Sequence, residues 1–518
     1  MNHTRSITVP GCIAAQHKGV LSGILGLLAG AMVASAPNVA AAASTAPARR
    51  PNILVIMSDE HNVDVTGCYD NAIVRTPNLD RLAEGGITFD AAYTNSPLCV
   101  PSRLAFTAGK YISRTGAWSN NCWLPSEDYP SIARVMTEAG YDAVVAGKMH
   151  YDVTRCYGFR RIAAEPRNNI KNGRGGRRSA DDLTVNRNAG EVRFRNFYPD
   201  DDSSVMRPDR RVTEAVVEFL SNRTDREQPF FLVAGYLAPH FPLIVPEKYW
   251  ARYRDRVPMP VIPDNLLASL PLNYQHLRAG FGLVDVDPDI VKKGRELYYG
   301  LTEWFDDQVG LVLRSLEEGG LADNTIVIYT TDHGENMGEH GLWWKNCMYE
   351  HSARVPLIVH WPARWSGGQR RAGVCSLVDL VQTIAELGGA RVPDDWDGDS
   401  LVDYLDDPQA QWKDFAVSEY YAHNIASGFA MFRQNRYKYV YHTRADEKHP
   451  PQRELYDMHT DPQEFQNLAD DSAQQERIER MHALLVRELG EAPDRTEQRA
   501  RRDLARGYDR PPVEKPKP

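Results

Sequence analysis

Charged and polar side chains gather at four places in the sequence, each directly after a short apolar run. The runs are rich in aliphatic and β-branched residues, the pattern of a strand buried on both faces of a parallel sheet. In open parallel sheets, functional groups collect just beyond the carboxyl ends of the strands. We therefore expect one site built from four segments, namely Ser58-Asp59-Glu60-His61, Gly147-Lys148-Met149-His150, Ala238-Pro239-His240 and Thr331-Asp332-His333-Gly334.

The residue types at these strand ends indicate which chemistry the site performs. Taken alone, Asp59 or Asp332 is more often a helix cap or turn residue, Lys148 a solvated side chain and His240 part of a turn. Together they are better explained as a site. Oxygen ligands from two strand ends suit a hard divalent cation such as Ca²⁺ or Mg²⁺. Lysines and histidines around such a cation suit an anionic group that undergoes acid–base chemistry.

A cysteine stands directly before a predicted helix in the segment Cys99-Val100-Pro101-Ser102-Arg103. Pro101 and Ser102 favour a helix start, which places Cys99 at the positive end of the helix dipole, where an anion is stabilised. Considered in isolation, a buried structural cysteine would explain the segment equally well. The rest of the sequence decides between the two interpretations.

The cysteine segment and several others together resemble one family, the formylglycine-dependent sulfatases of the alkaline-phosphatase-like superfamily. The resemblance is to choline-sulfatase-like and arylsulfatase-like members and runs in order from Pro51 to Asp470. The matching segments are CVPSR with its downstream glycine, PNILVIMSDEH, GKMH, PHFP, TDHGENMGEHGLWWK, YEHSARVPLIV and ELYDMHTDPQEFQNLA. In this family the cysteine is oxidised to an aldehyde, so Cys99 is implied to become formylglycine (3-oxoalanine).

The resemblance also implies a metal site. The ion would be one Ca²⁺ per subunit, in preference to Mg²⁺ or Mn²⁺. The family usually has Asp or Gln where Glu60 stands, and many members have Asn where His333 stands. The implied ligands are Asp59, Glu60, the modified Cys99, Asp332 and His333.

Further residues have implied roles in the reaction itself. Arg103 would orient the aldehyde hydrate, Lys148 and Lys345 would hold sulfate oxygens, and His150 and His240 would handle protons. One hydroxyl of the hydrated aldehyde attacks sulfur, and the other later loses its proton so that sulfate is expelled. An alternative is hydrolysis of phosphonate monoesters or phosphodiesters on the same fold. A third interpretation is an exported binding protein with a degenerate site, which is disfavoured because every motif position carries a competent residue.

The elements that must position these residues alternate along the chain. Strand-like runs at Asn52–Ser58, Ala143–Ala146, Phe230–Tyr236, Thr325–Thr330 and Pro356–Trp361 are separated by helical patterns. The helical patterns cover Pro77–Glu84, Ser131–Ala139, Arg211–Asn222, Glu296–Glu318 and Leu377–Leu387. This alternation predicts an α/β fold with a mostly parallel central sheet flanked by helices.

The pattern changes after about residue 400, and we divide the chain accordingly. Residues 50–400 are the expected catalytic domain, and residues 401–490 a small C-terminal subdomain of antiparallel strands with a helix at Gln474–Leu489. Residues 491–518 are charged and proline-bearing, and we expect a disordered tail. Residues 1–45 combine a basic start, an apolar core and small residues, which is typical of a secretory signal peptide.

Composition and targeting limit the partners and the location. The formal net charge of −9 argues against a nucleic-acid binder. An exported enzyme, periplasmic or secreted, is expected to meet a sulfate-ester substrate, a sulfatase-maturation enzyme and the export machinery. No stable membrane insertion is expected, and the oligomeric state is left open.

Substrate identity depends on a basic segment, Arg155–Arg195. It holds 11 Lys and Arg against 4 Asp and Glu and has no clear period, so we expect a long loop or insertion. By resemblance to choline-sulfatase-like members, Met149 and the Thr107-Ala108-Gly109 ending favour a choline-like substrate. A basic loop at the pocket would instead attract polyanions such as sulfated glycans. The simpler alternative is a solvated surface segment.

Overall fold

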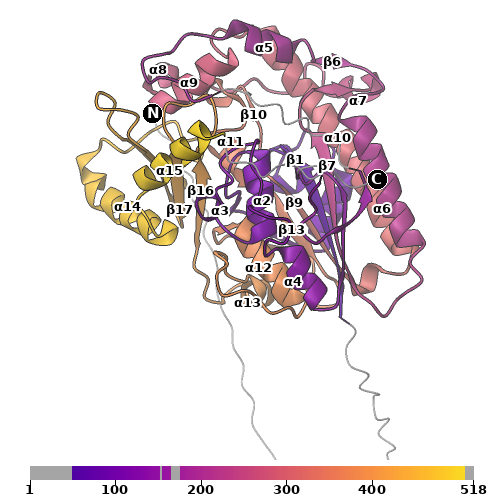
Figure 1. Ribbon diagram of the computed structural model, residues 1–518. Coiled ribbons are helices and arrows are strands. Elements are labelled where there is room, and N and C mark those ends of the chain that lie inside the picture. Colours follow the sequence, from indigo (N-terminus) through magenta and orange to yellow (C-terminus); the bar gives the residue numbers. More distant parts are fainter. Residues whose placement is uncertain (1–49, 152–153, 165–175, 508–518) are drawn as a thin grey trace, which may run out of the picture. The chain divides into compact units, whose positions relative to one another are not determined.

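The computed structural model describes residues 50–151, 154–164 and 176–507. The proposed signal peptide, the centre of the basic segment and residues 508–518 lie outside these ranges. The central sheet, of which Figure 1 labels β1, β7, β9 and β13, has the strand order β14-β2-β13-β9-β1-β7-β4-β5. Its strands are β1 Asn52–Asp59, β2 Ile87–Phe89, β4 Asp142–Gly147, β5 Arg160–Ala163, β7 Phe230–Pro239, β9 Thr325–Thr331, β13 Leu357–His360 and β14 Gln369–Arg371.

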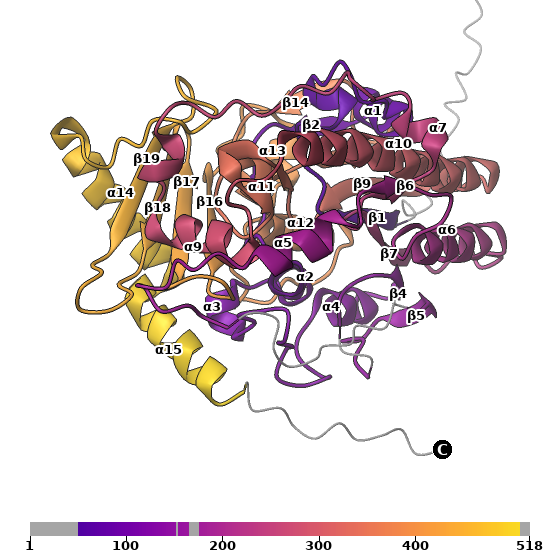
Figure 2. The same ribbon diagram turned by 90° about the horizontal axis from the view of Figure 1, so that it is seen from above.

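Side chains of β1 alternate between two hydrophobic cores, one on each face of the sheet. Leu54 and Ile56 belong to the core under α1 Pro77–Glu84, α6 Met206–Ser221 and α10 Pro288–Glu318. Ile53 and Val55 belong to the core under α2 Cys99–Ala108, α4 Ile132–Glu138 and α12 Leu377–Leu387. Figure 2 shows α1 and α10 on one side of the sheet and α2 and α4 on the other. Burial on both faces explains why the strand is apolar throughout.

The strand register places the four strand ends side by side. β1 runs parallel to β9 with Ser58 opposite Thr331, and parallel to β7 with Asp59 opposite Pro239. β4 runs parallel to β7 with Gly147 opposite Gly235. The α/β class and the mostly parallel sheet are thus confirmed. β13 is the antiparallel exception among the predicted strands, because it pairs antiparallel with both β9 and β2. Its apolar sequence is compatible with either direction.

The antiparallel C-terminal sheet is confirmed. It has the order β16-β17-β18-β19, and α14 Gln475–Leu489 packs on it. Its strands are Phe415–Tyr420, Phe429–Gln434, Tyr437–His442 and Gln452–Asp457. Both sheets belong to one compact unit, Arg49–Pro518, so the boundary at residue 400 stays a prediction.

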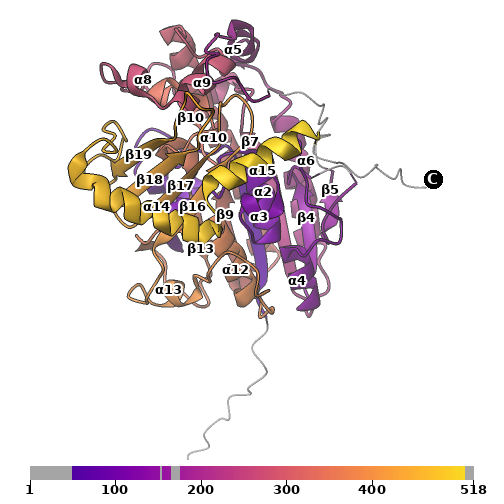
Figure 3. The same ribbon diagram turned by 60° about the vertical axis from the view of Figure 1, so that its left-hand side comes forward.

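The expected disorder from residue 491 is wrong for part of the tail. Residues Pro493–Ala505 form helix α15, with Pro493 at its first position and Thr496 and Ala500 buried. Arg499 donates to Ser113 O at 2.9 Å, and Asp503 accepts from Trp118 Nε1 at 2.8 Å. Figure 3 shows α15 beside α3 Ile112–Thr115. The charged composition suggested a solvated chain, but several charged side chains of the helix, among them Glu497, Arg499 and Asp503, find partners on the rest of the protein.

The basic segment is also more structured than expected. It contributes the edge strand β5 and helix α5 Arg187–Phe194. No helix in the described residues is long and apolar enough to cross a membrane. The remaining short strands are β3 Ala92–Tyr93, β6 Tyr198–Pro199, β8 Ile244–Val245, β10 Asn336–Met337, β11 Trp343–Trp344, β12 Arg354–Val355 and β15 Cys375–Ser376. The remaining helices are α7 Glu247–Trp250, α8 Leu266–Ser269, α9 Leu272–Phe281, α11 Glu350–Ala353 and α13 Val402–Asp406.

Candidate active site

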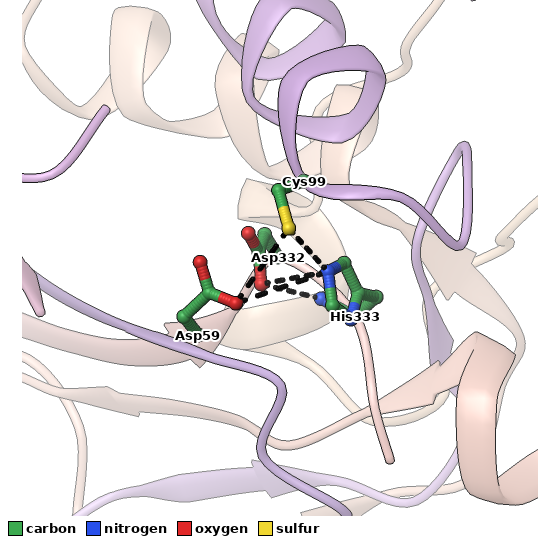
Figure 4. Close-up of side chains that lie close together, drawn as sticks. All are labelled: Asp59, Cys99, Asp332 and His333. Carbon is green, nitrogen blue, oxygen red and sulfur yellow. Dashed lines mark hydrogen bonds and ion pairs between the residues drawn. The ribbon is translucent and has the colours of Figure 1, made fainter. Parts of the chain in front are cut away.

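Four buried side chains from three elements converge at the carboxyl end of the central strands (Figure 4). Asp59 ends β1, Asp332 and His333 follow β9, and Cys99 is the first residue of α2. One ligand atom from each of the four lies within 4.8 Å of the others. Cys99 Sγ is 3.2 Å from His333 Nε2 and 3.7 Å from Asp59 Oδ1. The structure thus brings these four predicted site residues together, while their roles stay predictions.

Arg103 balances the charge of the two buried aspartates. Its Nε donates to Asp332 Oδ2 at 2.7 Å and its Nη2 to Asp59 Oδ2 at 3.2 Å. The guanidinium also donates to Ser58 O at 2.9 Å and Lys148 O at 2.6 Å, so it ties the ends of β1 and β4 together. Arg103 lies one turn after Cys99 on α2, which explains how the helix delivers both the thiol and the counter-charge.

A second group lies next to the first and contains Glu60. Lys345 Nζ is 2.8 Å from Glu60 Oε1, and His240 Nε2 is 3.1 Å from Glu60 Oε2. Lys345 Nζ is also 3.0 Å from His240 Nε2. Lys148 pairs with Asp59. Glu60 thus points to Lys345 and His240, and its assignment as a metal ligand stays a prediction.

The electrostatic environment favours an anion at position 99. Burial raises the pKa of the Cys99 thiol, but the charges of Lys345 and Lys148 with that of His333 outweigh burial and hold the pKa well below its ordinary value. A hydrogen bond from His150 acts in the same direction. Burial would lower the pKa of His333, but Asp332 and Cys99 raise it to about 9.

The two aspartates differ in their response to burial. Burial raises the pKa of Asp332, and the neighbouring charge of Asp59 adds to this effect. For Asp59, burial and the Cys99 charge act in the same sense, but Lys148 leads the cationic groups that bring its pKa below the usual range. The carboxylates of Asp59 and Asp332 therefore repel each other, and Arg103 compensates for only part of this repulsion.

The backbone adopts uncommon conformations at the site. Glu60, His150, Trp344 and Asn346 all have positive φ, at 63°, 60°, 66° and 83°. Such angles are uncommon for residues with a side chain and cluster at functional sites. Here they turn the chain sharply after β1 and β4 and on either side of Lys345, which aims the intervening side chains at one point.

A cavity of about 610 Å³ opens onto Cys99. Its wall combines aromatic rings, amides and cations, and no Asp or Glu of the described residues lines it. The lining includes Cys99, Asn120, Asn121, Lys148, His150, Arg177, Asn186, Arg193, His240, Phe241, Phe281, Trp344, Lys345, Asn346, Asn424 and Leu504.

A family model described as sulfatase matches residues 51–390, which is more than half of the chain. The chain belongs to the sulfatase family. A second model, described as N-sulphoglucosamine sulphohydrolase, C-terminal, matches residues 338–490. The arylsulfatase of Clostridium perfringens is 28% identical over 470 residues, covering 85% of this sulfatase and 94% of that protein. The prediction of a sulfuric ester hydrolase is confirmed.

Solved structures similar to this sulfatase agree on the fold. One, a complex with D-glucosamine-2-N,6-O-disulfate, is 23% identical with a TM-score of 0.69, covering 86% of this chain and 99% of that one. Another, the phosphonate monoester hydrolase of Agrobacterium radiobacter, is 22% identical with a TM-score of 0.69, covering 85% and 96%. At these identities the likeness concerns the fold, which is the predicted alkaline-phosphatase-like one.

Sequence reasoning missed most of the pocket wall of this sulfatase. Asn424 and Leu504 come from the C-terminal region, and Phe281 comes from α9. It also missed Asp209, which accepts from Leu237 N and Ala238 N at 2.8 Å each and so holds the end of β7 near His240. No local pattern marks these residues. Their placement depends on contacts between segments far apart in the sequence.

Two arginines of the basic segment are not free surface charges. Arg177 lines the pocket and pairs with Glu497, while Arg178 donates to Asp182 O and Thr184 O. The interpretation of this segment as solvated surface is wrong for both. Arg174 lies outside the described residues.

Proposed function

We propose that this sulfatase hydrolyses sulfate esters with a nucleophile made from Cys99 by oxidation to formylglycine. The observation that carries the proposal is the position of Cys99 Sγ. It lies at the first residue of α2, buried, facing the cavity and surrounded by cationic groups. The sulfur marks where the hydroxyls of the aldehyde hydrate would stand, and that hydrate would supply both the attacking oxygen and the means to release sulfate.

The buried acids fit a divalent cation. Carboxylate oxygens of Asp59 and Asp332 lie together with His333 and position 99, and the repulsion that raises the pKa of Asp332 would be relieved by a cation between them. Hard oxygen donors favour Ca²⁺, with Mg²⁺ or Mn²⁺ as weaker candidates. We propose Asp59, Asp332, His333 and the modified Cys99 as ligands, with Glu60 as a further candidate. A bound cation would stabilise charge on the transferred sulfate group.

The remaining residues handle charge and protons. Lys148 and Lys345 line the pocket beside Cys99, and we propose that they hold sulfate oxygens as negative charge shifts onto them. His150 and His240 line the same wall, and we propose that they move protons at the nucleophile and at the leaving oxygen. Arg103 would keep the aspartates ionised and in place.

The lining of the pocket bears on the substrate. A cationic substrate such as a choline ester needs carboxylates or an electron-rich cage. No acid among the described residues lines this cavity, and the rings of Phe281 and Trp344 already lie under the Arg193 guanidinium. We therefore favour a sulfated glycan or a small neutral or anionic organosulfate over a choline-like ester. Hydrolysis of phosphonate monoesters or phosphodiesters is the alternative reaction.

A substrate panel tests the proposed function. The protein is co-expressed with a sulfatase-maturation enzyme and assayed with phenyl sulfate, hexose 6-sulfates, choline sulfate and phenyl phenylphosphonate. We expect sulfate release, with a higher kcat/KM for a sulfate ester than for the phosphonate. A higher kcat/KM for the phosphonate would establish the alternative reaction, and no turnover of any ester would contradict both.

Export rests on residues 1–45, whose pattern is that of a signal peptide. We propose a periplasmic or secreted enzyme that meets the export machinery and the maturation enzyme before it reaches its substrate. Expression of the full chain followed by N-terminal sequencing of the exported product tests this. A product that still begins at Met1 would contradict it.

A further inference from the structure

Three segments that are distant in sequence form one wall of the pocket. Residues 176–178 of the basic segment, the loop of residues 421–428 and helix α15 meet there. Asn424 N donates to Gly176 O at 3.1 Å, and Arg178 N donates to Ile425 O at 3.0 Å. Arg177, Asn424 and Leu504 all line the cavity that opens onto Cys99.

Glu497 of α15 locks Arg177 into this wall. Nη1 and Nη2 of Arg177 donate to Oε1 and Oε2 of Glu497 at 3.0 and 2.7 Å, with side-chain exposures of 9% and 4%. Glu497 also accepts from Gly428 N at 3.0 Å and from Arg501 Nε at 2.6 Å. A bidentate pair fixes the plane of the guanidinium as well as its position. Arg177 is therefore held rigidly by a carboxylate that is itself held from two other directions.

These pairs do not use one hydrogen-bond donor of the Arg177 guanidinium. The Nε–H of Arg177 is buried and has no hydrogen-bond acceptor among the described residues. Buried polar groups are almost always hydrogen-bonded, because an unpaired one bears the full cost of losing water. Arg177 lines the cavity, and an acceptor that reached this donor from the pocket would satisfy it.

We propose that Arg177 determines specificity by donating its Nε–H to an oxygen on the alcohol portion of the sulfate ester, with Glu497 as its positioning residue. The proposal rests on the proposed function, which places the sulfate group at Cys99, Lys148 and Lys345. Glu497 offsets the charge of Arg177 at close range, which leaves the Nε–H as a directed donor. Such a donor suits a hydroxyl or ring oxygen, and the asparagines of the lining suit the same kind of group.

Two probes with matched sulfur chemistry test the proposal. One is cyclohexylmethyl sulfate. The other is whichever 6-sulfate of glucose, galactose or glucosamine the enzyme hydrolyses best. Both are sulfates of a primary alcohol on a six-membered ring, but only the sugar has further oxygens. A site built to hydrogen-bond a substrate oxygen rejects the analogue that lacks it. We expect the wild type to favour the sugar in kcat/KM.

The variant Arg177→Lys keeps the charge but removes the Nε–H and the forked pairing. We expect it to lower the sugar-to-cyclohexyl ratio of kcat/KM by about 10-fold or more, mainly through KM for the sugar. Arg178→Gln is the control, because Arg178 is the next residue, does not line the cavity, and has its partners at Asp182 and Thr184. It should leave the ratio unchanged.

Glu497→Gln tests the positioning role. It should lower the same ratio in the same direction, and the double variant with Arg177→Lys should lose little more than Arg177→Lys alone, because both changes remove one interaction. A merely structural Glu497 would lower both kcat/KM values equally and add to the effect of Arg177→Lys.

Several outcomes would overturn the inference. An unchanged ratio in a folded Arg177→Lys protein means that the Nε–H serves only water. If that variant does not fold, the wild type still decides, because equal kcat/KM for the two probes contradicts the proposal. Turnover of phenyl sulfate without turnover of any of the three hexose sulfates would also overturn it and leave the proposed function intact. Turnover of no sulfate ester would be a failure of the proposed function.

Discussion

Arg103 shows how one side chain allows a dense group of buried charges to exist. It is fully buried and pairs with both Asp59 and Asp332, and burial, which would lower its pKa, is outweighed by these acids, so the pKa lies above its ordinary value. Removing one partner of a buried pair leaves an uncompensated charge, which costs far more than the pair contributes. The cluster therefore acts as a unit, and single substitutions in it are expected to have large effects.

Replacing the nucleophile separates its two proposed tasks. Cys99→Ser cannot be oxidised to the aldehyde, so a serine that accepts sulfate would have no internal route to release it. We expect turnover to fall by at least about 10³-fold, and mass spectrometry after incubation with substrate to detect sulfate on the introduced serine. Cys68→Ser is the control, since Cys68 is half-buried and does not line the pocket. Full turnover by Cys99→Ser, or by wild type with an unmodified thiol, would contradict the mechanism.

Replacing Asp332 tests the metal assignment. A ligand that binds only the folded state raises Tm as its concentration rises. We expect Ca²⁺ to raise the Tm of the wild type, and Asp332→Asn to lose this shift and at least about 10²-fold in kcat/KM. Asp209→Asn removes another buried acid near the site but outside the cluster, so it should lower Tm and keep the calcium-dependent shift. A chelator-treated wild type with undiminished activity would refute the assignment.

At the scale of elements, the site depends on how closely β4 and β7 approach. Gly147 has φ of 78° and lies against Gly235, and Lys148 N donates to Gly235 O at 2.8 Å. This contact allows the chain to leave β4 with Lys148 next to Asp59 and with the Lys148 carbonyl accepting from Arg103. Because glycine has no side chain, Gly147 and Gly235 let β4 and β7 approach closely. The charged residues that follow the strand ends can then lie close together.

A methyl group at this crossing should damage both stability and activity. A Cβ at position 235 would lie 1.9 Å from Lys148 O, and backbone cannot move aside as a flexible side chain can. We expect Gly235→Ala to lower the free energy of unfolding by about 2 kcal/mol or more and to reduce kcat. The measurements are urea unfolding and steady-state kinetics.

Gly389→Ala provides the matched comparison. Gly389 has φ of 65° and nothing within 4 Å of an added Cβ, so it probes backbone strain without a clash. We expect Gly389→Ala to lower the free energy of unfolding by about 1 kcal/mol and to leave the steady-state kinetics unchanged. Equal losses of stability in the two variants, with normal kinetics in both, would mean that the approach of β4 to β7 is not what places Lys148.

At the scale of the whole molecule, the antiparallel sheet is joined to the catalytic part through β16. Glu419 on this strand is fully buried, with Oε2 accepting from Ser113 N at 3.2 Å and Oε1 accepting from Tyr421 Oη at 3.2 Å. Burial raises the pKa of Glu419 to about 7, although these hydrogen bonds lower it. Glu419 at this junction is therefore protonated at acid pH and carries an unfavourable buried charge at alkaline pH.

This junction should make stability depend on pH. Because the folded state binds the proton more tightly than the unfolded state, stability is fully present below the unfolded pKa and is lost as pH rises through about 7. Glu419→Gln removes the titration and keeps the accepting oxygen. At pH 8 we expect it to exceed the wild type in free energy of unfolding by roughly 3 kcal/mol, with the difference vanishing near pH 4. A variant less stable than wild type at pH 8 would contradict the assignment.

The sequence by itself determined the α/β class and the rim residues, because both are recorded locally. Each strand is a short apolar run, and Asp59, Lys148, His240 and Asp332 follow such runs directly. Parallel pairing then brings the strand ends together without further information. The motif around Cys99 likewise lies in five consecutive residues, and together with the other matching segments it identified the family.

Only the tertiary structure decided the features that depend on distant partners. The direction of β13 follows from its place between β9 and β2, since its apolar side chains suit either direction. Helix α15 was mistaken for a tail because its charges find partners such as Arg177, 320 residues away. Glu60 points to Lys345 and His240 because of the turn after β1. A local pattern indicates which element a segment can form. The partners of a buried charge are determined only when segments far apart in the sequence pack together and exclude water.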